Sequence, residues 1–121
     1  TGMWKADTEL ILGIQRDPDF GPLVMVGAGG VLVELMKDVQ LAPAPVSHAT
    51  ARAMLGRLRS LPLLTGYRGR EPADLDVIAD AIVRLGQLAV SADGRVQELD
   101  INPLFVAGKR IAAADARATL A

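Results

Sequence analysis

Three residues with oxygen-bearing polar side chains stand at every second position near the C-terminal end of the chain: Glu98, Asp100 and Asn102. Because the side chains of a strand alternate between its two faces, this spacing predicts that all three point to one face of a strand over residues 96–106. Carboxylate and amide oxygens are ligands that Mg²⁺ prefers, and Mg²⁺ usually shares them with phosphate groups. An amphipathic strand with one wet face, or a turn begun by Asn102 and Pro103, explains the same pattern without a ligand.

A fourth polar residue, Asp115, is expected on the neighbouring strand. Residues 107–110 (Ala-Gly-Lys-Arg) predict a hairpin turn, after which the chain returns antiparallel over residues 111–117. In such a hairpin Asn102 and Asp115 lie nearly opposite one another, where cross-strand Cβ atoms are about 4.5–5.5 Å apart. Asp115 is surrounded by alanines, and a lone charge in such a place requires a partner. We therefore expect that these two residues could ligate one ion.

The composition limits the classes of protein to consider. With 121 residues, of which 50% are hydrophobic, the chain has the size and apolar content of one small domain with one core. Lys and Arg (13) nearly balance Asp and Glu (14), and aromatic residues make up only 3%, which argues against a nucleic-acid-binding protein. The absence of cysteine excludes disulfides and fits a cytoplasmic location. No apolar run approaches the roughly 20 residues that span a bilayer, so we expect no membrane segment.

The remaining pattern predicts an α+β fold, a mainly antiparallel sheet with two helices on one face. Strands are predicted over residues 9–16, 23–26, 96–106 and 111–117. The first helix is predicted over residues 49–59 with Ser47 as its N-cap. The second is predicted to begin at Pro72 and to carry a long apolar stripe that ends at Ala89, which we interpret as core.

Residues 27–30 (Gly-Ala-Gly-Gly) form a glycine-rich stretch after the second predicted strand. Glycine lets a backbone approach a ligand closely, and such loops can present N–H groups to phosphate. The stretch is not a Walker loop, because no Lys-Ser/Thr follows it. It is not the dinucleotide fingerprint either, because Leu32 stands where the third glycine belongs. A tight turn at the end of a strand is the competing interpretation.

His48 is the only histidine of the chain. It falls in the first turn of the first predicted helix, where we expect it to be exposed. No group of partners is evident near it in the sequence. We therefore interpret it as inert rather than as a metal ligand or a phosphate acceptor.

With these residues in view, the chain resembles the ATP-grasp domain of ADP-forming (NDP-forming) acyl-CoA synthetases, which are relatives of succinyl-CoA synthetase β. The matching pieces cover almost the whole chain, in order: residues 9–13 (Glu-Leu-Ile-Leu-Gly), 16–22 (Arg-Asp-Pro-Asp-Phe-Gly-Pro), 27–30 with Glu34, 37–39 (Lys-Asp-Val), 66–69 (Gly-Tyr-Arg-Gly), 98–104 (Glu-Leu-Asp-Ile-Asn-Pro-Leu) and 114–117 (Ala-Asp-Ala-Arg). The second and sixth pieces are specific in combination.

The resemblance implies roles for individual residues. In such enzymes Mg·ATP, or ADP after transfer, lies between two ATP-grasp subdomains, and Asn102 and Asp115 would hold the Mg²⁺. Asp100 would be catalytic, because it would face the histidine that is transiently phosphorylated during acyl-CoA chemistry. The positions on the nucleotide side of the site would be Glu9, Gly27, Gly29 and Gly30.

The resemblance also implies partners for the chain. Residues 1–121 would form one domain, the second subdomain of an ATP-grasp fold. Its partners would be the preceding ATP-grasp subdomain and a CoA-binding domain or subunit that carries the phosphohistidine. The whole enzyme would be an acid–CoA ligase that converts acyl-CoA, ADP and phosphate to acid, CoA and ATP, or the reverse. We expect the isolated chain to be inactive, and Ala42 departs from the arginine that relatives often carry there.

Two other functions stay open at the level of sequence. The chain could be a regulatory nucleotide- or ligand-binding module of a protein acetyltransferase fused to a synthetase-like region. It could also be a structural piece that promotes oligomerisation, with a wet strand face that has no ligand. The sequence does not select the acyl group, the choice between ATP and GTP, or an oligomeric state.

Overall fold

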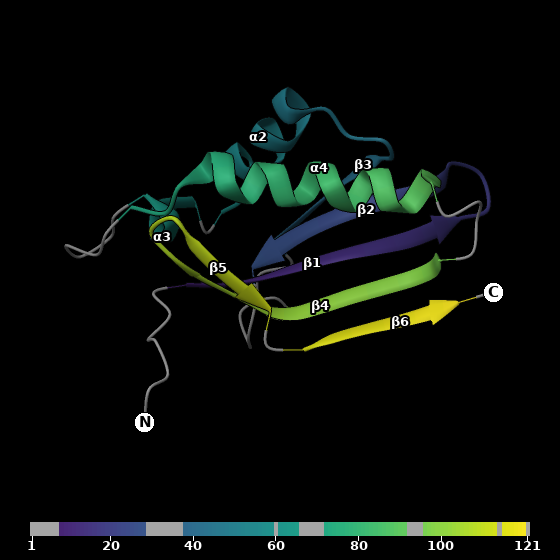
Figure 1. The fold of residues 1–121 in the computed structure, drawn as a ribbon. Helices are drawn as coiled ribbons and strands as arrows, with labels where there is room; N and C mark the ends of the chain where they lie inside the picture. The colour runs from purple at the N-terminus through teal and green to yellow at the C-terminus, as the bar shows by residue number, and fades with distance from the viewer. Residues whose placement is uncertain are drawn as a thin grey trace.

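The chain forms a sheet of antiparallel strands beneath a layer of helices (Figure 1). The computed structural model describes residues 8–28, 38–59, 61–65, 72–91, 96–113 and 115–120. The strands in these ranges are β1 (Thr8–Asp17), β2 (Gly21–Ala28), β3 (Val39–Pro43), β4 (Val96–Ala107), β5 (Arg110–Ala113) and β6 (Ala116–Leu120). The helices are α2 (His48–Gly56), α3 (Leu61–Leu64) and α4 (Leu75–Ser91).

The strands follow the order β3-β2-β1-β4, and both β5 and β6 pair with β4. Every pair is antiparallel. Helices α2 and α4 lie over one face of the sheet (Figure 1), so the predicted α+β architecture is confirmed. In the ranges given above, no helix covers the opposite face, which we call the open face. None of the described helices is long and apolar enough to span a membrane.

The core lies between the sheet and the two long helices. Strand β1 contributes Leu10, Leu12 and Ile14, which alternate with residues that face the open side. Helix α4 contributes the predicted apolar stripe, of which Ile78 and Ile82 are fully buried. Each such side chain stabilises the fold by about 1.5–3 kcal/mol relative to an exposed one. Packing against α4 therefore helps to set the position of β1, and β4 is held in place by its pairing with β1.

The two long helices begin at side-chain caps. The predicted cap of α2 is confirmed, because Ser47 Oγ accepts a hydrogen bond from the Thr50 N–H at 3.1 Å. The predicted start of α4 at Pro72 is wrong, since the helix begins at Leu75. Asp74 caps it by accepting hydrogen bonds from the N–H groups of the second and third helical residues, at 3.0 and 3.3 Å. An aspartate at the N-cap accepts hydrogen bonds from these N–H groups. A proline at the first helical position is compatible with the helix, but its side chain accepts no hydrogen bond.

Two further parts of the sheet differ from the predicted strands. Residues 39–43 form the strand β3, for which no strand was predicted, and they pair with the outer edge of β2. The predicted return strand over residues 111–117 is instead two strands, β5 and β6. The interruption between them lies beside Pro103, which has no N–H to continue the ladder.

Strand β4 carries one more residue than β1 between the pairs Leu10–Leu104 and Leu12–Ile101. A second shift lies near Val96 in the pairing with β6. Because the side-chain period of a strand is two, one extra residue moves all later side chains to the other face. Leu104 and Val106 therefore enter the core beside the helices, while the even-numbered residues 98–102 lie on the open face.

Arg16, at the end of β1, joins α4 to β4. Its Nε donates a hydrogen bond to the Val96 carbonyl at 2.9 Å, and its Nη2 donates one to the Ala89 carbonyl at 3.1 Å. Ala89 lies in the last turn of α4, where carbonyl groups lack helical partners and the helix dipole favours a positive charge. This side chain fixes the end of α4 against the start of β4.

We predict that Arg16→Met lowers the free energy of unfolding by about 2 kcal/mol, because two hydrogen bonds from a charged donor are lost. Urea unfolding followed by circular dichroism measures the change. Arg84→Met, on the exposed side of α4, is the control and should change stability by less than about 0.5 kcal/mol. Equal losses in the two variants would contradict the bracing role of Arg16.

Candidate functional site

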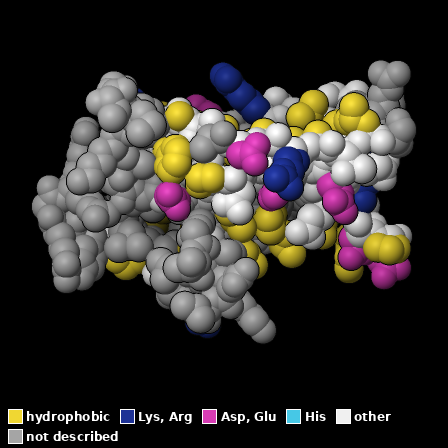
Figure 2. All heavy atoms as spheres, turned by 90° about the horizontal axis from the view of Figure 1, so that it is seen from below, with side chains coloured by type: hydrophobic (Ala, Val, Ile, Leu, Met, Phe, Trp, Pro, Cys, Tyr) yellow, Lys and Arg dark blue, Asp and Glu magenta, His cyan; other side chains and the backbone are white. Residues whose placement is uncertain are grey.

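Polar side chains gather on the open face where β4 runs between β1 and β6. We call this group the polar cluster, and it consists of Glu98, Asp100 and Asn102 of β4, Asp115, and Arg117 of β6. All five are exposed. Figure 2 views the molecule from the open side and shows acidic side chains there, with a basic one among them. The period-two prediction for the three β4 residues is confirmed over this short stretch.

Asn102 and Asp115 lie opposite one another, as the hairpin pattern predicts. The Asn102 N–H donates a hydrogen bond to the Asp115 carbonyl at 3.2 Å. The next pairs along the same register are Ile101–Ala116 and Asp100–Arg117. Directly opposed residues of an antiparallel pair share a face, so the amide of Asn102 and the carboxylate of Asp115 lie on the same side of the sheet.

Arg117 lies near both Asp115 and Asp100. Its Nε lies 3.7 Å from Asp115 Oδ2, and it stands across from Asp100. Both members of the ion pair are well exposed, Arg117 by 84% and Asp115 by 59%, so solvent screens their attraction. In the sequence, Arg117 stands out only as part of the motif at residues 114–117. Its position opposite Asp100 on the predicted hairpin was the signal that could have identified it.

A hollow of about 320 Å³ opens beside the polar cluster, with both β4 carboxylates on its rim. It is lined by Ile14, Gln15, Arg16, Met25, Glu98, Leu99 and Asp100. Gly13 lies directly opposite Asp100 on β1. A Cβ at that position would stand 2.9 Å from the Leu99 carbonyl oxygen and 3.2 Å from Met25 Cε, so the close approach of β1 to β4 requires glycine there.

The donors of the polar cluster fit a hard divalent cation that keeps part of its shell for other ligands. In the described ranges no three His, Cys, Asp or Glu side chains converge as a metal site built from protein alone would require. The facing pair of Asn102 and Asp115 supplies one amide oxygen and one carboxylate. Mg²⁺ is commonly held by one or two protein oxygen donors together with water and phosphate oxygens, so two donors are sufficient for it.

The structure places the predicted nucleotide-side residues apart from this pair. Glu9 is exposed on β1 and pairs with Phe105, three residues along β4 from Asn102. Gly27 lies in β2, with β1 between it and β4, so its backbone is about 10 Å from β4 at the usual spacing of strands. Gly29 and Gly30 lie outside the described residues.

Gly27 is part of a strand rather than of a loop, which corrects the prediction for residues 27 and 28. It pairs with Ile11 on one side and with Val39 on the other. A Cβ at Gly27 would stand 2.6 Å from Val39 Cγ1 and 2.8 Å from the Asp38 carbonyl oxygen. The packing of β2 against β3 therefore explains this glycine without a ligand.

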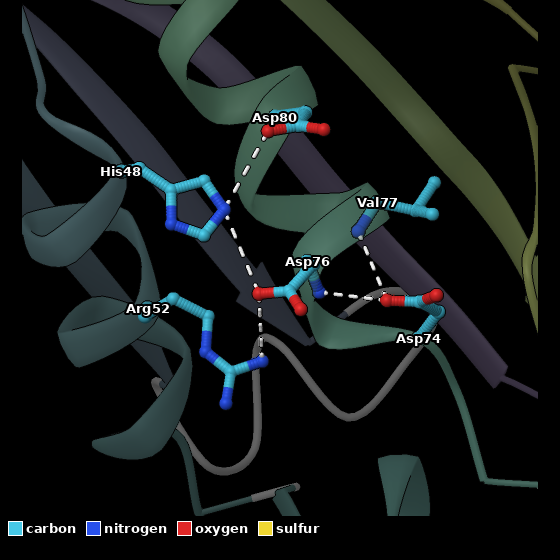
Figure 3. Close-up of polar contacts among 6 residues, drawn as sticks. All are labelled: His48, Arg52, Asp74, Asp76, Val77 and Asp80. Atoms are coloured by element: carbon cyan, nitrogen blue, oxygen red, sulfur yellow. Dashed lines mark hydrogen bonds and ion pairs between the residues drawn. The ribbon is translucent and has the colours of Figure 1, made fainter.

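His48 has two acidic neighbours that the sequence did not indicate. Its Nε2 lies 3.6 Å from Asp76 Oδ1 and 3.5 Å from Asp80 Oδ1, and Arg52 also contacts Asp76 at 3.3 Å (Figure 3). The predicted exposure of His48 is confirmed, and the packing of α2 beside α4 supplies partners that were not evident in the sequence. These four residues join the helices on the side of the sheet away from the polar cluster.

A protein-family model described as an ATP-grasp domain matches residues 1–120. The chain belongs to the ATP-grasp family. Among solved structures, it is similar to the dinucleotide-forming acetyl-coenzyme A synthetase 1 of Ca. Korarchaeum cryptofilum, with a TM-score of 0.92 and 43% identity over 98% of this chain and 55% of that one. That protein was solved in complex with coenzyme A and Mg-AMPPCP, with its phosphohistidine segment pointing towards the nucleotide binding site.

Two curated relatives show the same similarity at the level of sequence. The beta subunit of acetate–CoA ligase (ADP-forming) I of Pyrococcus furiosus is 42% identical over 112 residues, which are 93% of this chain and 48% of that subunit. The 4-hydroxybutyrate–CoA ligase (ADP-forming) of Nitrosopumilus maritimus is 42% identical over 107 residues, which are 88% of this chain and 15% of that ligase. This ATP-grasp chain thus spans about half of the Pyrococcus subunit and a smaller part of the longer ligase.

We predict that Gly27→Ala lowers the free energy of unfolding by about 2 kcal/mol or more, because the added methyl group collides with backbone and with a branched side chain of β3. Gly56→Ala is the matched control. Apart from its chain neighbours and the backbone of α2 itself, nothing lies within 4 Å of a Cβ at Gly56, at the end of that helix, so alanine there should be neutral or stabilising. Thermal unfolding of both variants measures the difference, and a tolerated Gly27→Ala would show that packing does not fix this glycine.

Proposed function

We propose that this chain is the second ATP-grasp subdomain of an ADP-forming acyl-CoA synthetase and that its polar cluster handles the phosphates of Mg·ATP or Mg·ADP. The observation that carries the proposal is the facing pair of Asn102 and Asp115 on the open face. An amide oxygen and a carboxylate held across a strand pair form a donor set for Mg²⁺ that needs phosphate to complete it. The family match and the Mg-AMPPCP bound by the Korarchaeum protein support the same assignment.

Within this proposal each residue of the pair has a defined task. Asn102 and Asp115 hold Mg²⁺, which when bound neutralises the charge of the phosphate oxygens during phosphoryl transfer. Both donors project from a paired region of backbone, and sites built on strands are more precise than sites on loops. The chain therefore fixes the position of the phosphates relative to the sheet.

Asp100 is proposed to act on a histidine supplied from outside this chain. Its carboxylate is exposed at the rim of the hollow, two residues from Asn102 on the same face. A carboxylate there would accept a hydrogen bond from one imidazole N–H, which leaves the other ring nitrogen free to take the phosphoryl group. The phosphohistidine segment of the Korarchaeum protein supports a partner of this kind.

The remaining parts of the enzyme are proposed to lie outside residues 1–121. They are the preceding ATP-grasp subdomain and the CoA-binding domain or subunit that carries the histidine. The acid is also proposed to be selected there, because relatives named for acetate and for 4-hydroxybutyrate are equally similar to this chain. We propose the cytoplasm as the location, which agrees with the absence of cysteine.

We predict that Asn102→Ala or Asp115→Ala, made in the full-length protein that contains this chain, weakens Mg²⁺-dependent formation of ATP from acyl-CoA, ADP and phosphate by about 100-fold or more at limiting Mg²⁺. Raising the Mg²⁺ concentration should restore part of the activity, because the loss lies in metal affinity. A coupled assay of ATP release over a range of Mg²⁺ concentrations measures both effects.

Asp80→Ala is the control for these variants. Its carboxylate is exposed to a similar extent, 64% against 59% for Asp115, but it lies on α4 beyond the other face of the sheet. It should leave the activity and its Mg²⁺ dependence unchanged. Normal Mg²⁺ dependence in both Asn102→Ala and Asp115→Ala would reject the metal site.

A further inference from the structure

We propose that Arg117 is a phosphate-binding residue. Until metal and nucleotide are bound, it pairs with Asp115 as a stand-in cation in place of the metal ion. The inference rests on the proposed function, because it concerns the same oxygen donors. It gives a role to a side chain that the acidic pattern of the sequence leaves unassigned. It also explains why a basic residue stands inside an otherwise acidic group.

The register of the hairpin places Arg117 at the centre of the site. It pairs directly with Asp100 across the strands, and it lies two residues from Asp115 on its own side of the hairpin. Both relationships put these side chains on one face, within reach of a long side chain such as arginine. The contact of Arg117 Nε with Asp115 Oδ2 at 3.7 Å agrees with this placement.

The ion pair between Arg117 and Asp115 is loose. The distance of 3.7 Å is longer than a charge-assisted hydrogen bond, and both side chains are mostly exposed. Exposed pairs of this kind contribute little to stability, since solvent and salt screen them. Arg117 can therefore leave Asp115 at small cost when another cation binds the carboxylate.

The charge balance of the face requires a cation. Glu98, Asp100 and Asp115 place three carboxylates close to the proposed phosphates, and all of these groups repel one another. Strands β1, β4 and β6 contain two cationic residues, Arg16 and Arg117. Arg16 is committed to two backbone carbonyls at the end of α4 and the start of β4. Arg117 is therefore the residue of these strands that can approach phosphate.

The two states exchange the partner of Asp115 without leaving its carboxylate uncompensated. With no metal bound, the guanidinium of Arg117 offsets the charge of Asp115. With metal on Asp115, the guanidinium turns to the phosphate oxygens, which its planar set of donors can contact in pairs. Arg117 thus lowers repulsion in the free site and adds binding energy in the filled one.

A structural role for Arg117 is the alternative. A charge on an edge strand such as β6 discourages pairing with other chains, and it needs no ligand. The two roles differ in what removal of the charge does to binding. A residue that only protects the edge has no effect on metal or nucleotide affinity, whereas a stand-in cation affects them in opposite directions.

The test compares Arg117→Met, Arg117→Lys and the control Lys109→Met in the full-length protein. Lys109 is an exposed cation in the turn of the same hairpin. Mn²⁺ affinity without nucleotide is measured by electron paramagnetic resonance, and ADP affinity in the presence of EDTA is measured by calorimetry. Circular dichroism checks that each variant is folded, which is expected for substitutions at a side chain that is 84% exposed.

Arg117→Met should bind Mn²⁺ up to about five-fold more tightly than wild type, because Asp115 no longer has a competing cation. The same variant should bind metal-free ADP about ten-fold or more weakly, because a charge-assisted contact to phosphate is lost. Arg117→Lys keeps the charge but not the planar donors, so its ADP affinity should lie between the two. Lys109→Met should match wild type in both measurements.

Unchanged ADP affinity in Arg117→Met would reject the phosphate contact, and weaker Mn²⁺ binding in that variant would reject the stand-in role. If the wild-type protein binds Mg·ADP normally, either of these results concerns the role of Arg117 alone. Wild-type protein that binds neither Mn²⁺ nor ADP would instead overturn the proposed function, together with this inference. The failure of one proposal is thus distinguishable from the failure of the other.

Discussion

The arrangement of this protein depends on the two register shifts in β4. All the even-numbered residues from Val96 to Val106 would share a face in a regular strand, which would place carboxylates and branched apolar side chains side by side. The extra residue near Pro103 turns Leu104 and Val106 into the core, and the shift near Val96 does the same at the other end. Only the segment between the shifts presents its even-numbered residues to the open face.

This geometry lets one strand serve stability at its ends and the proposed chemistry in its middle. The apolar ends belong to the core, and Arg16 fixes the last turn of α4 to the start of β4. The polar middle remains exposed, so its carboxylates keep their hydration and cause little loss of stability. The hairpin partner then brings Asp115 and Arg117 to the same place through backbone register alone. The precision of the site is thus a property of the backbone pairing.

Much of the fold could be predicted from sequence because its signals are local. The polar alternation at Glu98, Asp100 and Asn102, the apolar stripe of α4 and the cap at Ser47 each follow from a short pattern, and each agrees with the structure. The facing of Asn102 and Asp115 also followed from counting along one hairpin.

Other features could not be predicted because they depend on contacts between distant segments. In the sequence, Gly27 resembles a ligand-binding glycine, and only the packing of β3 against it explains the residue. The sequence of β3 has no strong strand pattern. His48 gains its acidic neighbours only through the packing of α2 on α4. Proline is common at the first position of helices, which favours a start at Pro72. Asp74, two residues later, caps the helix instead because its carboxylate accepts a hydrogen bond from a backbone N–H. For Gly27 and His48, the contacting residues are remote in the sequence. For the start of α4, two neighbouring residues are both favourable, and the sequence does not select between them.

The exposure of the polar cluster limits what these residues can do by themselves. The phosphoryl transfer to a histidine that we propose requires that water be kept from the reacting phosphate, because otherwise the nucleotide is hydrolysed. Within the part of the chain that the structure describes, the polar cluster is exposed, with Asp115 59% exposed, so these residues do not exclude water by themselves. Two protein donors likewise leave most of the coordination sphere of a magnesium ion to be filled from elsewhere. The arrangement is therefore that of one wall of a site, and closure by a second body over the open face would supply the low-dielectric environment in which its charges act strongly.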